Sequence, residues 1–291
     1  MRFALLVFLA FITGCSAGGG DTKLEPPKID WNSLEFTCTH EKDRLPKPDA
    51  EADEWFKTAR AYDKSGKESL ESQMLELYLK AAERSHVKAL NNLVLVYLEG
   101  QGVEPDAAQA VEYAERLVKM EIGMGYYHMG VFLEQGIGVE QDRPASLAYF
   151  RRAADLGNAQ GQHVVGKKLL RIHKDAPEPE RVRAIAIRML ECSLAQGAAM
   201  AGNELGWEFT EGTGEVSRGL AYFQKAAALG DRSSLYSLYS TFDEGKRGIK
   251  KDSARAACYY KLLEEVRADN KKTFPNIDRI CPLPPKPFAG G

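Results

Sequence analysis

Five cysteines and five histidines are the side chains of this 291-residue chain that could act as nucleophiles, proton carriers or metal ligands. The histidines are His40, His86, His128, His163 and His173. No two of them have the three- or four-residue spacing that brings two ligands to one helix face. The sequence also lacks HExxH, GxSxG and GxxxxGK[ST], which serve zinc hydrolysis, serine nucleophiles and phosphate binding. We therefore expect a chain that is not an enzyme and holds neither a metal nor a cofactor.

Paired glycines recur at residues 100–103 (GQGV) and 136–139 (GIGV). A phosphate cradle would need only one such loop, whereas a structural turn would return once in every repeat. Glycine adopts positive φ without a steric penalty, so a pair of glycines permits a tight chain reversal. The loops are therefore interpreted as turns and not as phosphate sites.

The glycine loops belong to a longer internal repeat. Residues 89–120 align without gaps with residues 125–156, at a spacing of 36 residues. Equivalent positions then follow along the chain at intervals of 36, 36, 40, 33 and 37 residues. These positions are Ala81, Leu117, Ala153, Ser193, Ala226 and Leu263. Regular spacing of this kind indicates a repeat architecture in which each unit stacks on the next.

Each repeat is predicted to form two helices. Apolar residues recur three and four positions apart in the second half of the unit, which is the period of an amphipathic helix. Asp106, Asp142 and Asp252 each stand where they can cap the N-terminus of a second helix. One helix pair cannot bury its apolar face alone, so neighbouring pairs must pack together into a solenoid.

The recurring pattern LGxxYxxGxGVxxDxxxAxxYxxxAAxxG resembles the Sel-like repeat family, which is related to tetratricopeptide repeats. The resemblance covers residues 51–267 and implies an all-α, right-handed α/α superhelical solenoid of about six helix pairs. It is strongest in units 87–122 and 123–158, and the glycine loop is lost in unit 159–197. An irregular N-terminal segment and a Pro-rich C-terminal tail, residues 268–291, lie outside the repeats.

The first residues resemble a bacterial lipoprotein leader. Arg2 precedes an apolar run from Phe3 to Ile12, which is too short to span a bilayer, and small residues lead to Cys15. Residues 12–15 (ITGC) resemble the lipobox, which implies that residues 1–14 are a signal peptide and that Cys15 is lipidated. Residues 15–50 would then form a lipidated tether and N-terminal segment, in the periplasm. Ser16 follows the lipidated cysteine, which by the same resemblance favours the outer membrane.

Four cysteines remain, and they allow three complete disulfide pairings. Cys192 lies in an apolar helical stretch and is interpreted as a buried small side chain. Cys38, Cys258 and Cys281 lie in or near the terminal segments, so we expect one disulfide that ties a tail to the repeats. A metal site is disfavoured because no two cysteines have CxxC-like spacing.

The charge balance restricts the kind of partner. The chain has 39 Lys+Arg against 41 Asp+Glu, a formal net charge of −2 that offers no attraction to nucleic-acid phosphate. Its 44 % hydrophobic content argues against a disordered chain. These values argue against nucleic acid as the partner, and the lipobox resemblance implies membrane contact through the lipid anchor.

Curved helical solenoids bind partners on the concave face, which is lined by the first helix of each pair. The repeat register places seven side chains toward this groove: Asn91, Tyr127, His163, Lys167, Asn203, Trp207 and Tyr236. Large aromatic side chains could anchor a partner, or they could fill gaps between helices. Both interpretations stay open for Tyr127 and Tyr236, whereas Trp207 favours the groove because it follows Gly206.

The resemblance extends to function. Some immunity proteins against phospholipase effectors of type VI secretion systems share a lipobox, Sel-like repeats and a Pro-rich end. This implies a periplasmic, lipid-anchored solenoid that binds and neutralises a secreted antibacterial phospholipase in its concave groove. The alternative is an envelope scaffold or signalling adaptor that assembles other proteins. A cell-wall hydrolase is disfavoured because the sequence has no catalytic motif.

Overall fold

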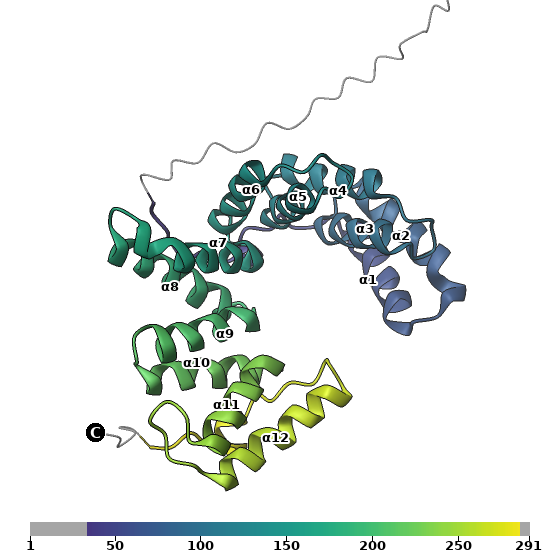
Figure 1. Ribbon diagram of the computed structural model, residues 1–291. Coiled ribbons are helices and arrows are strands. Elements are labelled where there is room, and N and C mark those ends of the chain that lie inside the picture. Colours follow the sequence, from purple (N-terminus) through teal and green to yellow (C-terminus); the bar gives the residue numbers. More distant parts are fainter. Residues whose placement is uncertain (1–33, 286–291) are drawn as a thin grey trace, which may run out of the picture.

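The computed structural model describes residues 34–285, and every regular element in this range is helical. The proposed signal peptide and the lipidation site Cys15 lie outside the described residues. Successive helix pairs follow an open arch (Figure 1). The all-α solenoid predicted from the repeats is confirmed, and the handedness of the superhelix stays a prediction.

Six helix pairs make up the arch within the described range. They are α1 (Ala50–Ser65) with α2 (Glu71–Glu83), α3 (Val87–Glu99) with α4 (Ala107–Lys119), α5 (Gly123–Gln135) with α6 (Arg143–Asp155), α7 (Ala159–Ile172) with α8 (Pro179–Ala195), α9 (Ala199–Trp207) with α10 (Val216–Ala228), and α11 (Arg232–Glu244) with α12 (Ser253–Ala268). A short helix, α13 (Ile277–Ile280), lies in the C-terminal segment. Single turns of 3-10 helix occupy Glu41–Asp43, Glu68–Leu70 and His173–Asp175, and a π turn at Glu208–Gly212 extends α9.

The helix starts follow the predicted capping residues. The carboxylate of Asp106 accepts hydrogen bonds from the backbone N–H groups of Ala108 and Gln109 at 2.9 and 3.1 Å. Asp142 and Asp252 cap α6 and α12 in the same way. These bonds satisfy donors that a helix terminus leaves without an intrahelical partner.

The second glycine of each paired loop sets the distance between neighbouring helix pairs. Gly102 and Gly138 have φ of +71° and +65°, as the sequence predicted. A Cβ atom on Gly138 would lie 2.6 Å from the carbonyl oxygen of Ala107, at the start of α4 in the preceding pair. Only glycine lets the loop approach that helix so closely.

An N-terminal strap, residues 34–49, runs back across the repeats from α8 toward α1. Leu34 accepts a hydrogen bond from the Arg181 side chain at 3.1 Å, at the start of α8. The N–H of Glu41 donates to the carbonyl of Gly157 at 3.0 Å, and its carboxylate accepts from Asn158 at 2.7 Å. The strap therefore bonds to helices that lie more than a hundred residues further along the sequence than the strap itself.

A C-terminal strap, residues 269–285, covers the other end of the solenoid. Phe274 and Ile277 are buried in a cluster that also contains Tyr259 and Leu262 of α12. The carbonyl of Cys281 accepts hydrogen bonds from the Tyr259 hydroxyl at 2.7 Å and from Gln224 at 2.8 Å. The strap thereby shields apolar surface of α10 and α12 from water.

Disulfides fasten both straps. Cys38 is bonded to Cys192 of α8, and Cys258 of α12 is bonded to Cys281. The interpretation of Cys192 as an unpaired core residue is wrong, although the residue is buried as expected. Its helical pattern reports burial but carries no information on which segment crosses over it. The expected disulfide that ties a tail to the repeats is present as Cys258–Cys281, and Cys38–Cys192 is a second one that was not expected.

The close approach at Gly138 predicts a specific loss of stability. Gly138→Ala places a side chain at positive φ and against the Ala107 carbonyl, whereas Gly248→Ala has the same sign of φ (+71°) and no atom within 4 Å. We expect Gly138→Ala to lower the free energy of unfolding by about 1–3 kcal/mol more than Gly248→Ala. Urea unfolding of the two variants measures the difference. Equal losses would show that the close approach of Gly138 to the Ala107 carbonyl does not contribute to the free energy of unfolding.

Candidate partner-binding surface on the first helices

Polar side chains link the first helices of successive pairs. The linked side chains are Asn91 with His128, Glu134 with Lys168, Lys167 with Glu204, and Asn203 with Ser234. The bonds join α3 to α5, α5 to α7, α7 to α9, and α9 to α11. We call this row of bonds the polar ladder. Asn91, Lys167 and Asn203, which were predicted to face a partner, use their side chains to link neighbouring first helices in it.

Trp207 and Tyr236 remain available for contact. The exposed fraction is 43 % for Trp207 and 54 % for Tyr236. The Trp207 ring meets the Phe223 ring edge-on at 5.5 Å, and the Arg247 guanidinium lies 4.9 Å from its centroid. These contacts hold the indole in one orientation while nearly half of its surface stays open, which suits an interface anchor.

Tyr127 and His163 lie deeper than the repeat register suggests. Tyr127 is partly buried and packs against Phe150 of its partner helix, with ring centroids 5.8 Å apart. The exposed fraction of His163 is 7 %, and its buried Nε2 has no hydrogen-bond partner within the described residues. The structure thus favours the gap-filling interpretation for Tyr127. The prediction that His163 faces the groove is wrong, because a first helix packs against neighbours on several sides and this side chain is buried between them.

Met200 belongs to the exposed surface and was missed by the sequence reasoning. Its exposed fraction is 54 %. Met200, Asn203 and Trp207 are spaced three and four residues apart, so they share one face of α9. This spacing was the available signal. Together with Tyr236, these residues form a surface that we call the α9–α11 face.

His128 of α5, which bonds to Asn91 of α3, is a buried titratable group. Burial lowers the pKa of His128 from its usual 6.5 to about 4. Its Nε2 lies 2.8 Å from the Asn91 amide oxygen, so a neutral ring with the proton on Nε2 satisfies both groups. Burial also lowers the pKa of His163. Neither ring is placed to carry a charge at neutral pH.

One group of side chains in residues 34–285 has metal-like proximity. Cys38, His40 and Cys192 offer ligand atoms within 4.8 Å of one another. The two sulfurs are bonded to each other, so they offer no thiolate to a metal ion. The group therefore acts as a fastening of the N-terminal strap.

The sequence profile of the Sel1 repeat matches residues 75–86, 87–120, 123–158 and 199–231. The chain carries Sel1 repeats. Residues 159–198 fall outside these matches, and they include the unit in which the paired glycines are replaced by a long loop. No curated protein matches the chain.

Solved structures similar to the whole Sel1 solenoid include two immunity proteins from Pseudomonas aeruginosa. Pa5087 is 29 % identical, with a TM-score of 0.66 over 88 % of this chain and 97 % of its own. PA5088 is 25 % identical, with a TM-score of 0.69 over 88 % of this chain and 96 % of its own. A Sel1 repeat protein from Oxalobacter formigenes, 22 % identical, shares the fold at a TM-score of 0.63 over 77 % of this chain and 93 % of its own.

No helix among residues 34–285 is both long enough and apolar enough to cross a membrane. The similarities to two immunity proteins and the exposed aromatic side chains together support a protein-binding solenoid. On the first helices, the α9–α11 face presents the exposed rings of Trp207 and Tyr236.

The buried His128 predicts a loss of stability in acid. Because the folded state favours the neutral ring, the unfolded chain binds a proton at higher pH, and stability falls as the pH drops from about 6.5 through about 4. The full contribution is about 3 kcal/mol. Urea unfolding from pH 7 to pH 4 should show a steeper decline in wild type than in His128→Gln. A ring titration near pH 6.5 by NMR would contradict this.

Proposed function

We propose that the chain is a periplasmic, lipid-anchored immunity protein that binds and neutralises a secreted antibacterial effector of phospholipase type. The observation that carries the proposal is the likeness to the two P. aeruginosa immunity proteins along 88 % of this chain. The lipobox-like residues 12–15 support the location, since a lipid anchor would hold the inhibitor at the bilayer that a phospholipase attacks.

The α9–α11 face is proposed as the contact surface. Trp207 and Tyr236 are large, partly exposed and braced by neighbouring rings. Aromatic side chains with this combination of rigidity and exposure dominate many interfaces. The polar ladder holds the first helices together, so the surface is formed before the partner arrives and less ordering entropy is lost on binding.

The scaffold or adaptor alternative differs in the number of partners. An immunity protein binds one effector tightly, whereas an adaptor binds several clients. Deleting the gene should leave cells sensitive to siblings that secrete the effector, and the purified effector should form a stoichiometric complex with this chain. Survival of the deletion strain in such a competition, with the secretion system active, would overturn the immunity function.

The contact surface can be tested separately. Tyr236→Ala should weaken the affinity for the effector about tenfold or more, because an exposed anchor ring is lost. Tyr260→Ala is the matched control, since Tyr260 is 44 % exposed but lies on a second helix, α12. Isothermal titration with each variant, after circular dichroism confirms folding, measures the effect. Equal affinities for both variants would move the contact surface elsewhere.

Membrane attachment depends on Cys15 in this proposal. Cys15→Ser should abolish the incorporation of palmitate into the protein, because the thiol that would carry the lipid is absent. Fractionation of labelled cells, together with incorporation of radioactive palmitate, measures the change. Unaltered palmitate incorporation into the Cys15→Ser protein would exclude lipidation at this residue.

A further inference from the structure

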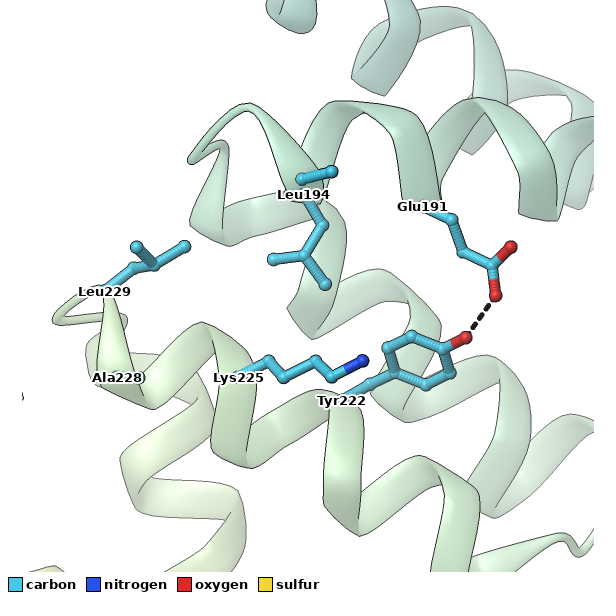
Figure 2. A pocket seen from close by; sticks show the side chains of 7 residues that line it. Glu191, Leu194, Tyr222, Lys225, Ala228 and Leu229 are labelled. Atoms are coloured by element: carbon cyan, nitrogen blue, oxygen red, sulfur yellow. Dashed lines mark hydrogen bonds between the residues drawn. The ribbon is translucent and has the colours of Figure 1, made fainter. Parts of the chain in front are cut away.

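A groove opens between the second helices α8 and α10 (Figure 2). Its volume is about 390 Å³. It is lined by Glu191, Leu194, Ala195, Tyr222, Lys225, Ala228 and Leu229. Leu194 and Leu229 make its walls largely apolar, and Leu229 keeps 39 % of its surface exposed.

The equivalent space one pair earlier, between α6 and α8, is occupied by the N-terminal strap. Leu34 and Phe36 pack in one cluster with Phe150 of α6 and Met189 of α8. Gln162 donates a hydrogen bond to the Thr39 carbonyl at 2.9 Å. An extended stretch of the chain therefore fills this groove with apolar side chains and accepts bonds through its backbone.

The equivalent space one pair later, between α10 and α12, is occupied by the C-terminal strap. Phe274 donates its N–H to the Ala228 carbonyl at 2.7 Å. Gln224 and Tyr259 both donate to the Cys281 carbonyl. Both neighbours of the open groove thus hold a segment of this same chain. The segment is extended in the N-terminal strap and contains the short helix α13 in the C-terminal strap.

The turns between pairs show the same pattern. A Cβ atom on Gly157 would lie 2.6 Å from the N-terminal strap, and one on Gly230 would lie 2.3 Å from the C-terminal strap. A Cβ atom on Gly197, at the turn that follows α8, would meet nothing within 4 Å. Among residues 34–285, nothing covers the turn at Gly197 or the groove between α8 and α10, whereas a strap covers the equivalent turn and groove on each side.

The polar end of the groove indicates the charge of an occupant. The Tyr222 hydroxyl donates to the Glu191 carboxylate, which also lies 3.5 Å from Arg218. Lys225 has its ammonium 5.2 Å from the Tyr222 ring centroid and forms no ion pair within the described residues. Lys225 is therefore the charge available to an occupant, and it favours a carboxylate.

We propose that the α8–α10 groove binds an extended segment of a partner protein that carries an apolar side chain next to an acidic one. The apolar side chain would pack between Leu194 and Leu229, and the carboxylate would pair with Lys225. The N-terminal strap shows that this chemistry suits such a site, because Leu34 is followed by Glu35, whose carboxylate pairs with Arg181 at 2.8 Å. This site lies on the second helices and does not depend on the proposed immunity function.

A displayed library of random twelve-residue peptides, selected against the soluble form (residues 16–291), tests the proposal. Selected peptides should share an apolar–acidic pair, and fluorescence anisotropy should show at least tenfold weaker binding to Lys225→Glu. Lys261→Glu, an exposed lysine on α12, is the matched charge control and should bind as wild type does. Trp207→Ala should also leave the affinity unchanged. Absence of enrichment, or binding that is insensitive to Lys225→Glu, overturns the proposal.

Other occupants are distinguished by photo-crosslinking. A photoreactive amino acid at position 229 should crosslink to a selected peptide, and mass spectrometry locates the bond. Without peptide, a bond to residues 16–33 of the same chain would show that the groove is filled intramolecularly, which contradicts the proposal. A bond between two copies of the chain would contradict it as well.

Discussion

The close packing of the two helices within a pair depends on glycines at the contact, where no side chain holds the helices apart. A Cβ atom on Gly130 would lie 2.7 Å from the Phe150 ring, and one on Gly206 would lie 2.3 Å from the Phe223 ring. Each ring also packs into a cluster with apolar residues of the next first helix, α7 or α11. One contact therefore sets both the spacing within a pair and the stacking of the following pair, and so the course of the arch.

The repeat position occupied by Gly130 and Gly206 holds a different residue in the last helix pair, at the C-terminal end of the solenoid. The repeat register places Tyr239 of α11 where Gly130 and Gly206 stand in earlier pairs, and Tyr260 where Phe150 and Phe223 stand. The rings of Tyr239 and Tyr260 lie 5.3 Å apart, and Tyr260 is 44 % exposed. A bulky residue replaces the glycine where no further pair stacks among the described residues. Terminal repeats of a solenoid are expected to differ in this manner, because their outer face meets water.

The features that could be predicted from the sequence are those that each repeat determines locally. The loop glycines, the capping aspartates and the helix pairs recur with a fixed spacing, so every copy adds to the same signal. The pairing of Cys38 with Cys192 was beyond reach, because it depends on the path of a strap that bonds to residues more than a hundred positions away. His163 was misplaced for a related reason. Helical register says which side chains share a face, but the degree of burial depends on how closely the next pair approaches.

Internal pairing of charges shapes what the surface can recognise. The ion pairs of Lys167 with Glu204 and of Lys168 with Glu134 link neighbouring first helices, so these charges already have partners before any protein binds. A partner would have to displace them to use their charge, at a desolvation cost that a new pair rarely recovers. The exposed rings of Trp207 and Tyr236 carry no such penalty. Because these ion pairs also hold the helices that present the rings, the proposed recognition on this face would depend on shape and aromatic contact more than on charge.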